Sequence, residues 1–193
     1  MPNNPSMKTF VTGLLKDKLP NFYFYHNLEH TLYVCSQAAV IGRAEGCTAE
    51  EIDLLETAAL WHDTGFITSA VNHEEEGCTL AMKYLPGYGY SAAAIRVICG
   101  MIMATRIPQS PQNKLESILA DADLEYLGTE NAGEKAADLF RELQYQDPLL
   151  TIAAWNDSQI VFLVKHHYFT RFCKETREQP KQEYLQRLLN GIE

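Results

Sequence analysis

The chain has 193 residues, of which 46% are hydrophobic and 21% charged, a composition that is typical of a globular protein and argues against a disordered chain. Sixteen basic and 25 acidic side chains leave a formal net charge of -9. This balance argues against a non-specific nucleic-acid binder, which needs many lysines and arginines. It is compatible with a small phosphate-bearing substrate, because bound metal ions can reverse the local potential.

The five cysteines are scattered and form no C-x-x-C pair, and the first residues lack the charged and apolar regions of a secretory signal. Both features predict reduced thiols in a cytoplasmic protein. No apolar run approaches the length that spans a bilayer. We therefore expect neither a membrane nor polymeric nucleic acid as a partner, and the sequence leaves a homodimer open.

Helical periodicity runs through the whole sequence, and strand-like alternation is missing. Capping signals open several of the helices: Ser6, Thr48 with Glu51, Ser91, and Asn113 with Glu116. The predicted helices cover residues 6–18, a segment from about 27 to Gly46, and residues 48–61, 73–85, 91–105, 113–128, 132–145, 157–176 and a short segment after Pro180.

These helices predict one all-α domain over residues 1–193, a compact helical bundle. Residues of about 22–128 carry the motifs described below. The C-terminal helices, residues of about 129–193, are expected to pack on that core.

Several histidines and aspartates lie at or near the ends of predicted helices. His26 and His30 are four residues apart at the start of a predicted helix, so both can lie on one face. His62 and Asp63 are adjacent at the end of the next helix. The pattern brings imidazole and carboxylate groups to helix ends, where they can converge.

Two further aspartates, Asp121 and Asp123, lie in a helix whose neighbours are apolar. A buried carboxylate is costly unless it is paired or bound to a metal. Imidazole nitrogen and carboxylate oxygen suit Zn, Mn or Fe, and Mg where oxygen and water dominate. A site of this kind has open positions for water and a phosphate oxygen, and its metal can generate hydroxide near neutral pH.

The ordered set of His, His-Asp and Asp in a helical chain resembles the ligand pattern of the HD superfamily of metal-dependent phosphohydrolases, over roughly residues 25–128. The resemblance implies a bundle of the HD-domain and phosphodiesterase type. It also implies one or two divalent ions (Mn, Mg, Fe, Co, Ni or Zn), held by His30, His62, Asp63 and either Asp123 or Asp121.

The segment from Tyr25 to His30 is similar to the Tyr-His-Asn-x-x-His segment of cyclic-nucleotide phosphodiesterases. This likeness implies that His26 is the general acid and His30 a metal ligand, with Asp63 among the catalytic residues. The phosphodiesterase likeness of Ala-Asp-Leu favours Asp123 as the last ligand, whereas other superfamily members align with Asp121. Asp121 therefore stays as an alternative ligand.

The sequence departs from the phosphodiesterases after Asp63, where Thr-Gly-Phe replaces a histidine-containing continuation, and no purine-clamping glutamine segment follows. The segment beginning at Asn72 resembles one in small bacterial HD hydrolases, which implies that His73 and Glu74 face the site. Thr105 and Arg106 can offer phosphate-binding groups. These residues also have a purely structural interpretation. His73 and Glu74 can simply form the N-terminus of a helix, where acidic residues are favourable, and Arg106 can be a solvated surface residue.

The expected function is hydrolysis of a small phosphate ester, a nucleotide monoester or cyclic diester, by metal-activated hydroxide with His26 as acid. One alternative is a non-catalytic HD module that senses a nucleotide or a metal. The other is a di-iron oxygenase on the same scaffold.

Overall fold

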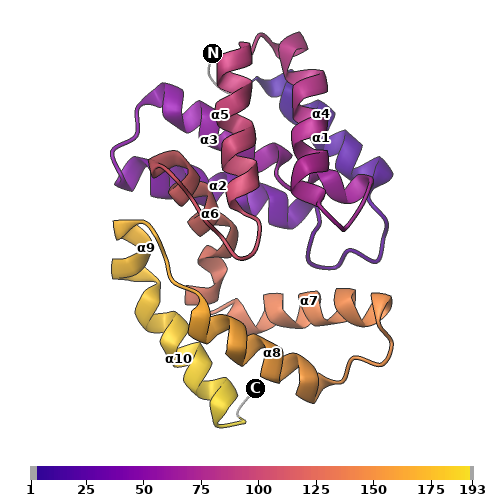
Figure 1. Cartoon of the computed structure of the whole chain (residues 1–193), viewed down its shortest axis with the longest axis vertical. Helices are drawn as coiled ribbons and strands as arrows, with labels where there is room; N and C mark the ends of the chain where they lie inside the picture. The colour runs from indigo at the N-terminus through magenta and orange to yellow at the C-terminus, as the bar shows by residue number, and fades with distance from the viewer. Residues whose placement is uncertain (1–3, 192–193) are drawn as a thin grey trace.

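The computed structural model describes residues 4–191, and the described residues form helices joined by loops, without a strand, as the sequence predicts (Figure 1). None of the described helices is both long enough and apolar enough to cross a membrane. The elements are α1 (Pro5–Lys18), α2 (Leu28–Ala44), α3 (Ala49–Trp61), η1 (Thr64–Ile67), α4 (His73–Tyr84), η2 (Leu85–Tyr88), α5 (Ala92–Ala104), α6 (Lys114–Leu124), η3 (Glu125–Gly128), α7 (Ala132–Gln146), α8 (Ile152–Lys165), α9 (Arg171–Thr176) and α10 (Glu178–Leu189).

Side-chain caps start three of these helices where the sequence predicts them. Thr48 and Glu51 form a capping box at α3, and Ser91 and Asn113 cap α5 and α6. The prediction of Ser6 as the cap of α1 is wrong, because the Asn4 side chain accepts the backbone N–H groups of the first turn. Proline at position 5 suits the first helical position, where its missing N–H costs nothing.

The predicted helix over residues 157–176 is wrong, because the chain leaves helical geometry between Lys165 and Arg171. The carboxylate of Asp121 accepts the backbone N–H groups of Phe169 and Thr170, which holds this segment in an extended form. The last helix begins at Glu178, before the proline rather than after it, since proline is tolerated in a first helical turn. The predicted helix over residues 113–128 ends as α6 at Leu124, followed by η3.

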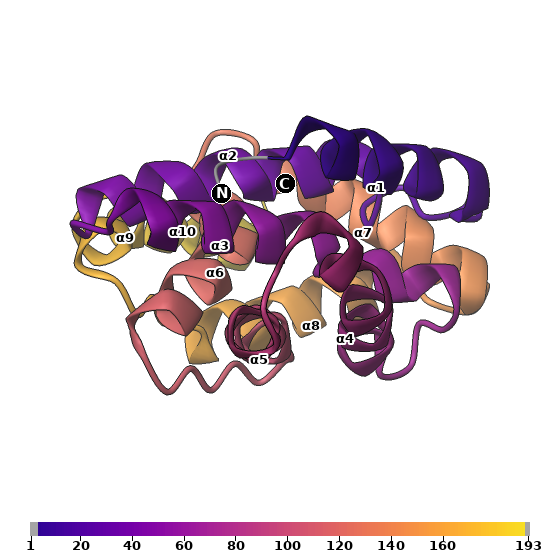
Figure 2. The same cartoon turned by 90° about the horizontal axis from the view of Figure 1, so that it is seen from above.

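The helices form two groups with separate hydrophobic cores. Helices α1 to α5 lie in the upper part of Figure 1 and α7, α8 and α10 in the lower part, and α6 leads from one to the other; Figure 2 shows the same helices from above. The first core centres on residues such as Trp61 and Ile98, and the second contains Tyr126, Leu163 and Tyr184. Tyr25, just before α2, belongs to the second core. The start of α2 and the end of α6 therefore lie where the two cores meet.

Candidate metal centre

Local helix geometry sets the position of each side chain in the candidate site. The Asn27 side chain caps α2 by accepting the backbone N–H of His30, so His30 lies in the first turn. His62 and Asp63 follow the last residue of α3, and Asp123 is in the last turn of α6. Three helix ends thus point their polar side chains into one region between the two cores.

These side chains converge closely. His30 Nε2 lies 3.1 Å from Asp123 Oδ1, and His62 Nε2 lies 3.6 Å from the same oxygen. Asp63 Oδ2 is 3.5 Å from His30 Nε2 and 3.2 Å from His62 Nε2. Within residues 4–191, the ligand atoms of His30, His62 and Asp123 lie within 4.8 Å of one another. We name these three residues and Asp63 the HHDD cluster; their roles as ligands stay predictions.

Two buried atoms of the HHDD cluster that make no hydrogen bond indicate whether the cluster suits a cation. His62 Nδ1 donates to the carbonyl of Ala59 at 2.7 Å, so Nε2 is the nitrogen that faces the cluster, and a cation that binds there would displace its proton. His62 Nε2 and Asp63 Oδ2 are both buried, and neither makes a hydrogen bond. Unpaired buried polar atoms are rare and costly, and a divalent cation can bind both an imidazole nitrogen and a carboxylate oxygen. The cluster can therefore hold a divalent metal.

The charges in the cluster are strongly coupled. Burial opposes charging of His62, but Asp63 and Asp123 outweigh it and raise the pKa of His62 well above its usual range. Burial likewise opposes ionisation of the two aspartates, but the histidines outweigh it and lower the pKa of Asp63 and of Asp123. Both carboxylates are consequently anionic near neutral pH, which favours cation binding.

Asp121 lies outside the HHDD cluster, although it is only two residues from Asp123. Its side chain is fully buried and accepts the N–H groups of Phe169 and Thr170 and the hydroxyl of Thr170, with the shortest of these bonds at 2.6 Å. Residues two apart on a helix point in different directions. Of the two ligands that the sequence leaves open, the structure brings only Asp123 to the histidines.

His73 and Glu74 lie beside the cluster, on the other oxygen of Asp63. His73 Nε2 is 3.8 Å from Asp63 Oδ1 and 3.5 Å from Glu74 Oε1. His73 Nδ1 faces the carbonyl of Ala70 at 3.3 Å, so Nε2 is the nitrogen that faces the carboxylates. The first turn of α4 thus extends the cluster, as the sequence predicts by resemblance.

A glycine allows α4 to approach Asp63 this closely. A Cβ atom on Gly65 would lie 1.8 Å from the carbonyl oxygen of His73, far inside van der Waals contact. A Cβ on Gly77 would lie 3.1 Å from the carbonyl oxygens of Trp61 and His62. Small residues at these two points let the backbone of α4 pack directly on the turn that carries His62 and Asp63.

His26 is held by a residue that the sequence analysis did not identify, Glu142 of α7. Glu142 Oε1 lies 2.5 Å from His26 Nδ1, and its Oε2 accepts the backbone N–H groups of Tyr25 and His26 at 3.0 Å each. Burial opposes charging of His26, but this hydrogen bond and nearby carboxylates outweigh it and raise its pKa. No sequence motif marks Glu142. It is recognised only in the structure, as a carboxylate on α7 that is 1% exposed.

Phe66 packs against two imidazoles. Its ring stacks on His26 with centroids 4.2 Å apart and on His73 with centroids 4.0 Å apart. The Phe66 side chain is buried, and Tyr23 packs against it. The Thr-Gly-Phe segment therefore supplies both the glycine that lets α4 approach and an aromatic ring that contacts His26 and His73.

Thr105 and Arg106 have different surroundings. Thr105 is buried, and its hydroxyl donates to the carbonyl of Ile102, so the structure does not bring it to the cluster. Arg106 donates to Glu74 Oε2 from Nη2 at 3.1 Å and also pairs with Glu75. It lies at the edge of the site, linked to the cluster through Glu74.

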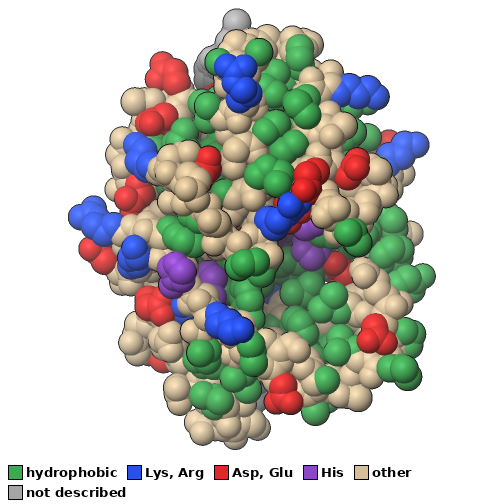
Figure 3. All heavy atoms as spheres, viewed as in Figure 1, with side chains coloured by type: hydrophobic (Ala, Val, Ile, Leu, Met, Phe, Trp, Pro, Cys, Tyr) green, Lys and Arg blue, Asp and Glu red, His purple; other side chains and the backbone are tan. Residues whose placement is uncertain are grey.

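The face of the molecule in Figure 3 shows histidine side chains reaching the surface near the level where the upper and lower helices meet. His26 and His73 are each about one-fifth exposed, at 22% and 21% of their side chains.

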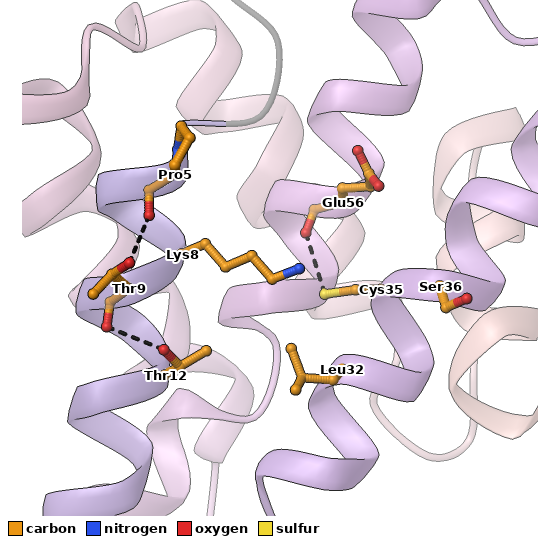
Figure 4. A pocket seen from close by; sticks show the side chains of 8 residues that line it. All are labelled: Pro5, Lys8, Thr9, Thr12, Leu32, Cys35, Ser36 and Glu56. Atoms are coloured by element: carbon orange, nitrogen blue, oxygen red, sulfur yellow. Dashed lines mark hydrogen bonds between the residues drawn. The ribbon is translucent and has the colours of Figure 1, made fainter.

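A groove of about 640 Å³ lies elsewhere, between α1 and α2, where Figure 4 shows Lys8 extending toward Cys35. This groove shares no residue with the HHDD cluster.

Comparisons with known proteins agree with this architecture. Among curated proteins, no sequence matches the chain. The fold resembles that of a predicted HD superfamily hydrolase from an uncultured Thermotogales bacterium, with a TM-score of 0.63 at 23% identity over 100% of this chain and 94% of that one. It also resembles that of a Lactobacillus plantarum protein, with a TM-score of 0.68 at 17% identity over 100% and 99% of the two chains. The HD-domain family model matches residues 27–125, just over half of the sequence. The chain belongs to the HD-domain family.

Proposed function

We propose that the protein is a metal-dependent phosphohydrolase that acts on a small phosphate ester of the nucleotide class. The observation that carries the proposal is the convergence of His30, His62 and Asp123. Two buried atoms at this point, His62 Nε2 and Asp63 Oδ2, make no hydrogen bond. The fold likeness to a protein described as a predicted HD superfamily hydrolase agrees with it. The nucleotide class rests on the likeness of the Tyr25–His30 segment to phosphodiesterases.

The HHDD cluster would hold the divalent cation. A bound divalent cation lowers the pKa of water and polarises a phosphoryl group. Asp63 has one oxygen toward His30 and His62 and the other toward His73, so it joins the two halves of the site. A second cation would be held on the side of His73 and Glu74.

His26 would supply the proton for the leaving oxygen. Its Nδ1 is bonded to Glu142, so the opposite nitrogen, Nε2, is the atom available to a substrate. A carboxylate behind an imidazole fixes the ring orientation and stabilises its protonated form. The ring of Phe66 stacks on this imidazole, which adds a second contact that favours one ring orientation. His26 is thereby oriented before the substrate arrives.

Arg106 would contribute positive charge at the mouth of the site. Its guanidinium is paired with Glu74 and Glu75, and its side chain is 36% exposed. Guanidinium groups bind phosphate oxygens with two parallel hydrogen bonds. A phosphate that enters the site would compete with the two glutamates for this guanidinium.

The test combines metal analysis with a phosphate-release screen. The protein is purified with Mn, Mg, Co or Fe in turn and assayed on nucleotide mono-, di-, tri- and cyclic phosphates. We expect one or two bound divalent ions per chain and hydrolysis of at least one of these esters. His62→Ala should lose both metal and turnover, whereas the matched control His167→Ala, at an exposed histidine outside the cluster, should retain both.

Three results would contradict the proposal. Full hydrolysis by His62→Ala would remove the cluster from the reaction. Tight nucleotide binding with no turnover under any metal would favour a sensing module. Oxygen consumption by the iron-loaded protein with a polyol, and no phosphate release, would favour an oxygenase.

A further inference from the structure

Two cysteines face each other where α4 packs against α5, helices that lie side by side in Figures 1 and 2. The Cys78 thiol donates to the backbone carbonyl of Cys99, with 3.5 Å between sulfur and oxygen. The Cys99 thiol faces the carbonyl of Cys78 at 3.9 Å. Each sulfur therefore lies against the backbone of the other cysteine.

The surroundings of the two thiols differ in a way that assigns them separate roles. Cys78 is 7% exposed, whereas Cys99 is only partly buried. The contact with Cys99, together with burial, raises the pKa of the Cys78 thiol, whereas the contact with Cys78 lowers the pKa of the Cys99 thiol. Cys99 is thus the more reactive and more accessible sulfur, because the thiolate is the nucleophilic form.

Cys35 provides a contrast within the same protein. It is also partly buried, but its thiol contacts the backbone of Glu56 and has no cysteine beside it in the hydrogen bonds of the described residues. Burial raises the pKa of Cys35 to about 12, with Lys8 opposing the rise. Cys35 is therefore protonated near neutral pH and serves as a matched single thiol.

We propose that Cys78 and Cys99 form an oxidisable dithiol that reacts with small peroxides. Cys99 loses its thiol proton and its sulfur attacks one oxygen of hydrogen peroxide: an S–O bond forms, the O–O bond breaks, and the hydroxide that leaves takes up that proton to become water, which gives a sulfenic acid. The Cys78 sulfur then attacks the Cys99 sulfur, so that an S–S bond forms, the S–O bond breaks and water leaves with the Cys78 proton. In total, two thiols are oxidised to a disulfide and the peroxide is reduced.

The disulfide would connect α5 to α4, the helix whose first turn lies beside the HHDD cluster. The first turn of α4 carries His73 and Glu74, and the residue Arg106 beyond α5 binds Glu74. The ion pair between Arg106 and Glu74 joins α4 to the end of α5, and the disulfide would join the middle of α4 to the middle of α5. Oxidation would therefore fix the first turn of α4 relative to α5. The inference does not depend on the proposed hydrolase activity.

The experiment uses the full-length wild-type protein, freed of reductant and treated with equimolar hydrogen peroxide. Free thiols are then alkylated and the protein is digested without reduction. We expect a peptide pair linked through Cys78 and Cys99, which disappears on treatment with a reductant. The same link should form in Cys35→Ser. In Cys78→Ser, a sulfenic acid should be trapped at Cys99 by a dimedone probe.

Recovery of Cys78 and Cys99 as separate alkylated or sulfinic peptides in the oxidised wild type would overturn the proposal, as would a link from Cys99 to any other cysteine. Because a cross-link restricts the unfolded chain, the linked wild type should also melt several degrees above the reduced form. A lower Tm would mean that the helices must separate to form the link, which would contradict the geometry.

Discussion

The segment that matches the HD-domain model and the helices after it contribute to the site in different ways. Residues 27–125 supply the HHDD cluster from helix ends with recognisable motifs. The later part of the chain supplies Glu142 of α7, which holds His26, and the backbone N–H groups in the loop between α8 and α9 that hold Asp121. The first region provides groups that can touch a cation, and the second fixes the orientation of groups around it. Loss of a residue should therefore have different consequences in the two regions.

The largest effect is expected in the first region. Asp123→Asn removes one anionic oxygen from the HHDD cluster, so the protein should lose bound divalent metal and fall to background hydrolysis. Metal content by elemental analysis and phosphate release measure the two effects. Wild-type metal content in this variant would place the cation somewhere else.

The second prediction moves to the C-terminal helices. Glu142→Gln keeps the shape of the side chain but removes the charge behind His26, so kcat should fall by about 10²- to 10⁴-fold, the usual contribution of a positioned acid or base. Metal content should not change, because Glu142 is not in the cluster. Glu134→Gln, at an exposed glutamate on the same helix, is the control. Simultaneous loss of metal and activity would show that Glu142 supports the cluster as a whole.

The third prediction concerns the contact between α4 and the His62–Asp63 turn. Gly65→Ala places a methyl group where the backbone of His73 lies, so the free energy of unfolding should fall by about 3 kcal/mol, the upper part of the range for overpacking. Urea denaturation measures this loss. Gly13→Ala, at a glycine with open space around it, should be close to neutral or stabilising. Equal stability of the two variants would refute the close packing of α4.

A fourth, smaller effect separates Asp121 from Asp123. Asp121→Asn weakens the bonds to Phe169 and Thr170, so the free energy of unfolding should fall by about 1–3 kcal/mol. Metal content should stay at the wild-type level, unlike that of Asp123→Asn. A loss of metal without a loss of stability would reverse the roles of the two aspartates.

A further effect concerns pH and the C-terminal core. Burial, and then the nearby Lys181, lowers the pKa of His166 to about 4. The unfolded chain therefore binds an extra proton below about pH 6.5, the ordinary value, and the stability contributed by neutral His166 is present above that pH and lost as the pH falls toward 4. His166→Gln should make unfolding less pH-dependent in this window, measured by urea denaturation. A constant difference between wild type and variant from pH 7 to pH 4 would contradict this.

The sequence predicts those parts of the fold that depend on local signals. The Thr48–Glu51 capping box and the caps at Ser91 and Asn113 lie within a few residues of their helices, so they can be read directly. The break between α8 and α9 could not be predicted in this way. It depends on Asp121, almost fifty residues earlier in the chain, which takes the N–H groups that a continuous helix would use.

The same distinction holds for the candidate site. His30, His62 and Asp63 carry a recognisable order and spacing, and the structure brings them together. Asp121 and Asp123 are two residues apart on one helix; the Ala-Asp-Leu likeness favours Asp123 but leaves Asp121 as an alternative, and packing separates them, because Asp121 is bonded to Phe169 and Thr170. Glu142 carries no motif at all, because its role depends on a contact with His26 across 116 positions.

The most direct measurement is a crystal structure of the manganese-loaded protein, with the ion located by anomalous scattering. We predict an anomalous peak within about 2.0–2.3 Å of His30 Nε2, His62 Nε2 and an oxygen of Asp123, the usual range of metal–ligand distances. If these atoms pointed apart with no peak between them while manganese was bound elsewhere, the HHDD cluster would not be a metal centre.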